Sequence, residues 1–194
     1  MRPAVFLDRD GTINEQLGYV NHISRFMLLP GVGKAISLLN KNNHIVVVTS
    51  NQSGVARGYF PIELVEETNE LMKRELAKDG AYTDGIYFCP HHPDGVVPDY
   101  SKECTCRKPH TGLIEKARSE LDIDMRRSYV IGDRWLDIEF AHNAELPGIL
   151  VLTGYGRGDF EYIVPHKHIK PTFVAEDLLR AVKWILKQDR HREE

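Results

Sequence analysis

Acidic residues occur where two predicted strands end. Asp8 and Asp10 follow a short apolar run in "FLDRDGT", and residues two apart on an extended chain project to the same side. Asp133 occupies the equivalent place in "VIGDRWLD". Carboxylates at the ends of neighbouring strands form an oxygen-rich site that suits magnesium, which also keeps waters and substrate phosphate as ligands. Asp137 is predicted either to support this site or to face the N-terminal dipole of a helix.

Two other interpretations of the first acidic pair are weaker. Asp10 and Gly11 could form an ordinary turn. A calcium loop would need further acidic or Asn ligands and a later glycine, and a helix should precede it, whereas a strand precedes Asp8.

Groups that bind phosphoryl oxygens occur in two further segments. The second predicted strand ends in "TSNQSGVARG", where hydroxyls, an amide and backbone N–H groups could cradle a phosphoryl group. Ser50 is the candidate hydroxyl, although its neighbour Thr49 leaves an ambiguity of one residue. Arg107 and Lys108 supply cations, the first as a bidentate fork and the second as a point charge.

All three cysteines lie in the segment 89–109, here called the cysteine loop. Cys89, His91, Cys104 and Cys106 form a C-x-H and C-x-C set, and three thiolates with one imidazole make a closed tetrahedral zinc site. An odd number of cysteines cannot pair completely, which also favours metal binding. His92 is the alternative fourth ligand. The zinc would be structural, because four protein ligands leave no open position, and it would order the neighbouring Arg107 and Lys108.

Short apolar runs alternate with amphipathic stretches along the chain, and this pattern predicts the elements that position these groups. We expect strands at 4–7, 44–50, 84–89, 128–133 and 148–154, with helices at 31–43, 61–80, 111–122, 135–145 and 175–188. Such alternation predicts an α/β fold, a parallel sheet with helices on both faces, as one domain over 1–194. The segment 14–30, the cysteine loop (89–109) and the segment 154–171 are expected to be irregular, and 189–194 to be a frayed tail. Ligands bind at the carboxyl ends of such strands.

Composition excludes several classes of protein. The formal net charge of the 194 residues is −3, which argues against a nucleic-acid-binding protein. No apolar run reaches the roughly 18 residues of a membrane span, and the N-terminus lacks the hydrophobic region of a signal peptide. We therefore expect a cytoplasmic monomer without membrane or nucleic-acid partners.

In their order along the chain, "DRDGT", Ser50, Lys108 and "GDRWLD" resemble the four motifs of the haloacid dehalogenase (HAD) superfamily of phosphatases. The resemblance spans 8–137 and implies a five-stranded Rossmann-like core. No segment between the motifs is long enough for a cap domain. It implies that Asp8 is the nucleophile, that Asp10 is the general acid and base, and that Ser50 and Lys108 hold the phosphoryl oxygens. Magnesium would bind Asp8, the Asp10 carbonyl and Asp133. Ser50 is a mild departure, because Thr is common at the second motif.

The cysteine loop and its "CRKP" end resemble a zinc-containing subgroup that acts on sugar bisphosphates or on histidinol phosphate. "GYV", "NQSGVARG", "CPHHP" and "GDRWLD" are more similar to the enzymes that take a phosphorylated sugar. A phosphatase of histidinol phosphate, or of a nucleotide or DNA 3′-phosphate, is the alternative, and a non-catalytic zinc-dependent binding module is a third. The resemblance implies nine substrate-binding residues: Gln16, Leu17, Gly18, Tyr19, Asn51, Gln52, Ser53, Arg107 and Arg134. "TGYGRG" from Thr153 is expected to be a mobile loop on the substrate side, with no clear helix after it.

Overall fold

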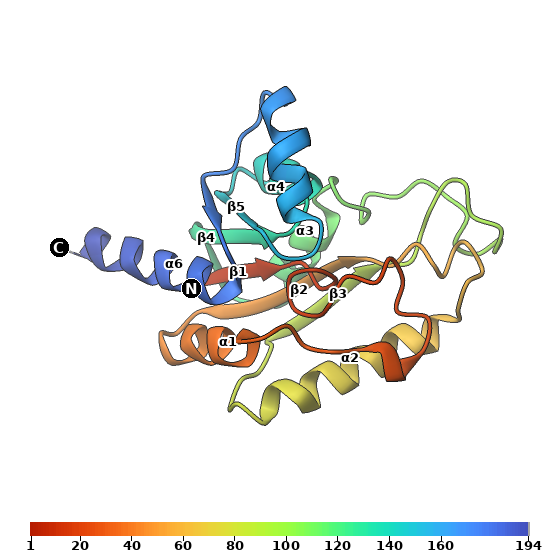
Figure 1. Cartoon of the computed structure of the whole chain (residues 1–194), viewed down its shortest axis with the longest axis horizontal. Coiled ribbons are helices and arrows are strands. Elements are labelled where there is room, and N and C mark those ends of the chain that lie inside the picture. The colour runs from red at the N-terminus through yellow and green to blue at the C-terminus, as the bar shows by residue number, and fades with distance from the viewer. Residues whose placement is uncertain (194) are drawn as a thin grey trace.

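The computed structural model describes residues 1–193, within which six parallel strands form one sheet in the order β3-β2-β1-β4-β5-β6 (Figure 1). The strands are β1 (Arg2–Leu7), β2 (Ile45–Asn51), β3 (Gly85–Cys89), β4 (Ile123–Gly132), β5 (Gly148–Val151) and β6 (Phe173–Ala175). The order reverses at β1, which pairs with β2 on one side and β4 on the other. Ligands of doubly wound sheets bind at such a reversal, outside the carboxyl ends of the strands.

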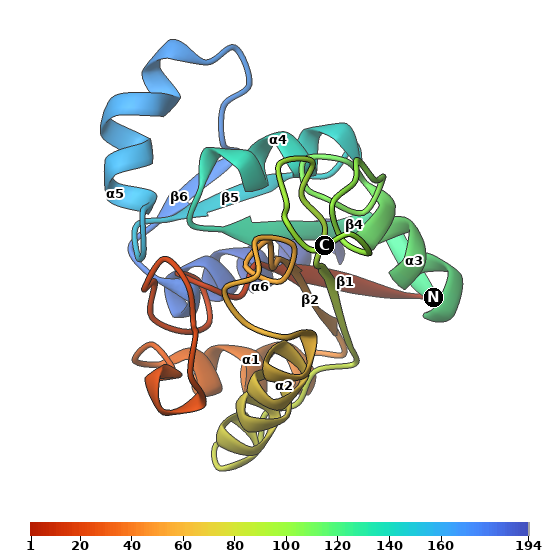
Figure 2. The same ribbon diagram turned by 90° about the vertical axis from the view of Figure 1, so that its right-hand side faces the viewer.

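Helices cover both faces of the sheet (Figures 1 and 2). The longer ones are α1 (Val32–Lys41), α2 (Ile62–Ala77), α3 (Gly112–Glu120), α4 (Trp135–Asn143) and α6 (Leu178–Glu193). Alternate residues of the strands separate two hydrophobic cores. Val5 and Leu7 pack with residues of α1, α2 and α6, whereas Ala4 and Phe6 pack with residues of α3 and α4. This two-sided burial explains why the central strands are apolar without alternation.

The sheet confirms the expected fold class, with differences at its edges. The segment 173–175 forms a sixth strand, β6, where five strands were expected, because three residues of an edge strand give too short a pattern to read. β4 begins at Ile123 rather than near residue 128. Its register with β1 shifts between Pro3 and Val5, where the Ser128 hydroxyl accepts the Ala4 N–H at 2.8 Å.

Two expectations about irregular segments were wrong. Part of 154–171 is helical, in α5 (Gly156–Gly158), η2 (Asp159–Ile163) and η3 (Val164–His166). The expected tail is also helical, since α6 continues to Glu193; Glu194 lies outside the described residues. The 3-10 turn η1 (Ile23–Arg25) lies in the loop after β1. Within residues 1–193, no helix is long and apolar enough to cross a membrane.

Met72 of α2 is fully buried in the core beneath β1 and β2, whereas Met27 is 57% exposed. Replacing Met72 by Ala should therefore lower the free energy of unfolding by about 2–5 kcal/mol, because it removes apolar contacts and leaves a cavity. Met27→Ala is the matched control and should change stability by less than about 0.5 kcal/mol. Urea unfolding curves of both variants measure the difference, and equal losses would contradict this assignment of the core.

Candidate active site

The carboxyl ends of β1, β2 and β4 meet at a cavity of about 290 Å³. Asp8 directly follows β1, Ser50 and Asn51 end β2, and Asp133 directly follows β4. The cysteine loop, green in Figure 1, lies beyond this end of the sheet between β3 and α3. The cavity is lined by Asp8, Asp10, Gln16, Gly18, Tyr19, Ser50, Asn51, Ser53, Arg107, Lys108, Arg134, Leu136, Asp137 and Tyr155. The topology therefore brings together residues that are more than a hundred positions apart.

Lys108 lies at the centre of the acidic groups. Its buried ammonium donates to Asp8 Oδ1 at 2.6 Å, to Asp137 Oδ1 at 2.5 Å and to the Thr49 carbonyl at 3.1 Å. The other Asp137 oxygen accepts the Arg134 N–H at 3.2 Å at the start of α4. Asp137 therefore supports the site by holding Lys108, and it also caps the helix.

This cluster contains more acidic than basic groups, since three carboxyl groups surround one ammonium. Burial, followed by repulsion from Asp8 and Asp137, raises the pKa of Asp133 to about 8. Burial likewise raises the pKa of Asp8 to about 7, although Lys108 opposes the shift. Burial alone would lower the pKa of Lys108, but the Asp137 and Asp8 carboxylates raise it above its ordinary value. One cation does not balance three carboxylates, so the site favours a further positive charge.

Asp133 fits a divalent metal. Its Oδ1 is buried without a hydrogen-bond partner in the described chain, while Oδ2 accepts the Tyr155 N–H at 2.8 Å. Ligand oxygens of Asp8, Asp133 and Asp137 lie within 4.8 Å of one another. Since both oxygens of Asp137 already accept hydrogen bonds, Asp8 and Asp133 are the better ligands. Hard carboxylate oxygens of this kind suit magnesium.

Two glycines allow the chain to approach Asp133 closely. Gly11 has φ +93°, and a Cβ there would lie 2.1 Å from Asp133 Oδ2. Gly154 has φ +53°, and its Cβ would lie 2.2 Å from the same oxygen and 2.7 Å from the Gly11 Cα. Thr153 Oγ1 donates to the Gly11 carbonyl at 2.6 Å. The segment expected to be a mobile loop is thus hydrogen-bonded to the site.

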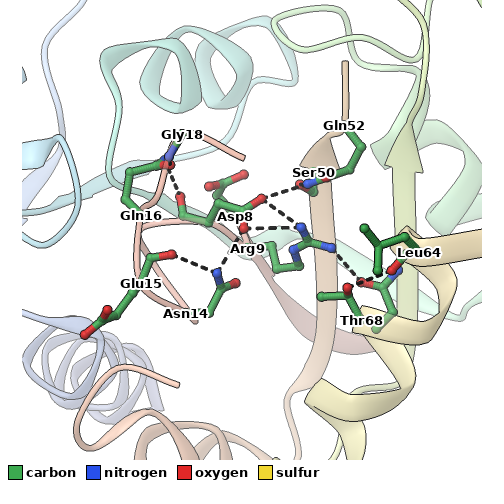
Figure 3. Close-up of polar contacts among 12 residues, drawn as sticks. Asp8, Arg9, Asn14, Glu15, Gln16, Gly18, Ser50, Gln52, Leu64 and Thr68 are labelled. Carbon is green, nitrogen blue, oxygen red and sulfur yellow. Dashed lines mark hydrogen bonds and ion pairs between the residues drawn. The ribbon is translucent and has the colours of Figure 1, made fainter. Parts of the chain in front are cut away.

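Four hydrogen-bonding contacts hold the Asp10 carboxylate, and their donors Arg9, Asn14 and Gln52 are labelled in Figure 3. Arg9 Nη2 lies 3.2 Å from Oδ1 and 3.0 Å from Oδ2, Asn14 Nδ2 donates to Oδ1 at 2.9 Å, and Gln52 Nε2 donates to Oδ2 at 2.7 Å. Burial raises the pKa of Asp10, but the Arg9 charge and the two amides outweigh it and lower the pKa below its usual range. The Asp10 carbonyl accepts Gln16 Nε2 at 3.2 Å.

At the end of β2, Ser50 lies in the cavity wall, and its Oγ accepts Gln52 Nε2 at 2.7 Å. Thr49 is not part of the wall, and its hydroxyl is buried without a hydrogen-bond partner in the described chain. The geometry therefore favours Ser50 of the two. Gln52 was expected to bind substrate, but it is buried behind the wall, where it joins Ser50 to Asp10.

Asn51, the last residue of β2, forms two hydrogen bonds with the backbone of Lys108. Its side chain accepts the Lys108 N–H at 3.0 Å and donates to the Lys108 carbonyl at 3.1 Å. Arg107, by contrast, donates to the carbonyl of His91 in the cysteine loop at 3.3 Å. The two adjacent cations thus have different anchors, one on β2 and one on the cysteine loop.

Other residues that line the cavity belong to the loop after β1 and to the start of α4. Gln16, Gly18 and Tyr19 line the cavity as expected, but Leu17 does not and is partly exposed. Arg134 and Tyr155 also line the cavity, and the Arg134 guanidinium lies 5.1 Å from the centroid of the Tyr155 ring. Neither Tyr155 nor Leu136, which lines the cavity as well, was among the predicted substrate-binding residues, although "TGYGRG", which contains Tyr155, was expected on the substrate side.

The four predicted zinc ligands of the cysteine loop lie together. Sulfur atoms of Cys89, Cys104 and Cys106 are 3.1–3.4 Å apart, beyond the roughly 2.05 Å of a disulfide, and all three cysteines are free. His91 Nδ1 lies 3.3 Å from Cys106 Sγ. The hydrogen bond between Cys89 and Cys106 lowers the pKa of Cys106 to about 5 and raises that of Cys89, so Cys106 is the thiol of this pair that more readily forms the metal-binding thiolate. A Cys3His set of this geometry can hold a metal ion.

His92 lies outside this group of ligands. Its Nε2 is 2.9 Å from Arg57 Nη2, and its Nδ1 accepts the Asp94 N–H at 3.1 Å. Burial and the charges of Arg107 and Arg57 lower the pKa of His92. The geometry therefore favours His91 over His92 as the fourth ligand.

A parallel sheet with acidic residues after β1 and β4, a hydroxyl at the end of β2 and a buried lysine defines the class of the HAD-like hydrolases. The HAD-hydrolase-like family model matches residues 105–181. The chain is 43% identical over 188 residues to the D-glycero-D-manno-heptose-1,7-bisphosphate 7-phosphatase of Thermosynechococcus vestitus, with 95% of each chain covered. It is 46% identical over 153 residues to the D-glycero-beta-D-manno-heptose-1,7-bisphosphate 7-phosphatase of Escherichia coli K12, covering 78% of this chain and 80% of that one.

Among solved structures, the D,D-heptose 1,7-bisphosphate phosphatase from B. bronchiseptica, complexed with magnesium and phosphate, has a TM-score of 0.83 at 32% identity. That match covers 96% of this chain and 99% of the other. The chain belongs to the family of these heptose bisphosphate phosphatases within the HAD superfamily.

Gly154→Ala should impair catalysis while the core stays folded, because the new methyl group must displace Asp133 or the Gly11 backbone. Disturbing the support of a metal ligand typically costs roughly 10- to 100-fold in affinity or activity. The readout is the hydrolysis rate of an aryl phosphate as a function of magnesium concentration. Gly158→Ala is the control, since nothing lies within 4 Å of its Cβ position. Equal activity of the two variants would contradict the close approach at Asp133.

Proposed function

We propose that this chain is a magnesium-dependent phosphatase that removes the C7 phosphate of D-glycero-D-manno-heptose 1,7-bisphosphate in bacterial heptose biosynthesis. The observation that carries the proposal is Asp8, paired with the buried Lys108 at 2.6 Å and facing the cavity beside Asp133. The choice of substrate is supported by relatives up to 47% identical that are named as heptose-1,7-bisphosphate 7-phosphatases. A cytoplasmic monomer stays a prediction from the sequence.

In the first step of the proposed reaction, an Asp8 carboxylate oxygen attacks phosphorus and forms an aspartyl-phosphate. The bond from phosphorus to the C7 oxygen breaks, and Asp10 in its protonated form gives its proton to the leaving alkoxide. Because its surroundings lower the pKa of Asp10, this form is the minor one in the substrate-free chain. Ser50 and Lys108 bind the phosphoryl oxygens. Magnesium, held by Asp8, Asp133 and the Asp10 carbonyl, would offset the repulsion between carboxylate and phosphate.

In the second step, Asp10 takes a proton from water, which attacks the phosphorus of the aspartyl-phosphate. The bond between phosphorus and Asp8 breaks, inorganic phosphate leaves, and both carboxyl groups return to their starting states. The same residue thus serves as acid and then as base.

Arg107 and Arg134 line the cavity and suit the second phosphate of a bisphosphate. This pair of guanidinium groups disfavours histidinol phosphate, whose non-reacting end carries an amine. Three intact acidic groups next to Lys108 also disfavour a non-catalytic zinc module.

Rates across a panel of substrates test the proposed function. The value of kcat/KM should be highest for a heptose 1,7-bisphosphate, with both anomers assayed, and lower for histidinol phosphate and 3′-phosphorylated DNA. Asp8→Asn should lower kcat by roughly 10³-fold or more without unfolding the chain, since the amide is isosteric but a poor nucleophile. A preference for either alternative substrate, or full activity of the variant, would overturn the proposal.

Zinc is proposed as the metal of the Cys3His set, and Cys104→Ser tests it. Metal analysis of the purified native chain should give close to one zinc, and the variant should contain much less, because thiolate ligands dominate the affinity. The sheet should remain folded, since Asp8 and Asp133 follow strands outside the loop. Ser119→Ala is a control on the exposed surface and should keep its zinc. A native chain without zinc, grown in zinc-containing medium, would contradict this account.

A further inference from the structure

Arg9 is a buried charged residue that the reaction described above does not use. It separates Asp8 and Asp10 in the sequence and is only 2% exposed. Its Nη2 donates to both oxygens of Asp10, and its Nη1 donates to Asn69 Oδ1 at 3.1 Å. Burying a guanidinium is costly unless it is paired and hydrogen-bonded. Arg9 is therefore held in one position by groups on two sides.

The second of these groups belongs to another element. Asn69 is a buried residue of α2, a helix that packs on the same face of the sheet as Val5 and Leu7. The planar guanidinium can reach Asn69 and the Asp10 carboxylate at the same time because its donors point in fixed, different directions. A lysine at this position would keep the charge but would lose that fork.

The Asp10 side chain is thereby restricted to one orientation. Arg9 contacts both carboxylate oxygens from one side, and Asn14 and Gln52 each donate to one of them. Gln52 also donates to Ser50, which the proposed reaction places on the phosphoryl group. Proton transfer requires the acid within hydrogen-bond reach of the leaving oxygen, so this orientation bears directly on the rate.

We propose that Arg9 is a positioning residue for proton transfer: anchored by Asn69 on α2, its guanidinium fixes the Asp10 carboxyl group toward the leaving oxygen. Arg9 does not touch the substrate, since it does not line the cavity. The inference rests on the proposed function, because it assigns to Asp10 the role of general acid. If Arg9 has this role, the rate of proton transfer depends on the position of α2, because α2 carries Asn69.

The test measures single-turnover release of the phenol from a series of aryl phosphates whose leaving groups span a wide range of basicity. A good leaving group departs without a proton, whereas a poor one needs the acid. Arg9→Lys should slow the poorest leaving groups by roughly 10- to 100-fold and the best ones much less, since general acid catalysis contributes roughly 10²- to 10⁴-fold. The rate should therefore depend more steeply on leaving-group basicity than in the native chain.

Two further variants keep the test decisive. Asn69→Ala removes the oxygen that accepts the Arg9 hydrogen bond. It should steepen the dependence in the same direction by a smaller amount, and it replaces Arg9→Lys if that variant does not fold. Thr68→Ala is the matched control, because this neighbouring buried residue of α2 donates its hydroxyl to the Leu64 carbonyl at 2.7 Å. It should lower stability and leave the dependence unchanged.

A role of Arg9 in stability alone predicts a different result. It would lower all rates by one factor and leave the dependence on leaving group as in the native chain, and that outcome in a folded Arg9→Lys or Asn69→Ala variant overturns the inference. Failure of the proposed function is separately visible, because Asp8→Asn would then release phenol as fast as the native chain.

Discussion

Crowding of negative charge around Lys108 is the constraint on which the active site depends. Asp8 and Asp137 both bind its ammonium, and Asp133 lies within reach of the same two carboxylates. Burial of these groups makes their mutual repulsion stronger than it would be in water. The arrangement is stable only because a cation lies between them, and it leaves room for a divalent metal and an anionic substrate to complete the balance. The fold supplies what such crowding needs: parallel strands that end at one place, and glycines that let the chain close around Asp133.

Several elements that are distant in the sequence support this small region. The segment after β5 donates to Asp133 and Gly11, the end of β2 holds Lys108 through Asn51, and α2 reaches Asp10 through Asn69 and Arg9. Each of these links is a hydrogen bond in a site that is largely shielded from water, where an unpaired polar group is costly. The orientation of the acidic side chains is therefore over-determined, and this suits chemistry that depends on the position of one proton and one phosphorus atom.

The sequence predicted those features that follow from local pattern. Apolar runs ending in Asp8 and Asp133 indicated both the parallel sheet and the place where its chemistry would occur, and the spacing of the cysteines indicated their common ligand set. It could not predict that Gln52 turns away from the cavity or that Leu17 lies outside it, because side-chain direction in a loop depends on tertiary contacts. β6 was missed because its pattern was too short, and the role of Arg9 because it depends on Asn69, sixty residues further along the chain.

The separate anchors of Lys108 and Arg107 have an evolutionary consequence. Lys108 is tied to β2 by the two-way hydrogen bond with Asn51, whereas Arg107 reaches the His91 carbonyl beside the metal ligands. A lineage that lost its cysteines would release Arg107 first and could keep Lys108 in place. Such a descendant would retain the means to transfer a phosphoryl group while its choice of substrate drifted. Two consecutive residues thus depend on different parts of the fold, one on the sheet and the other on the cysteine loop.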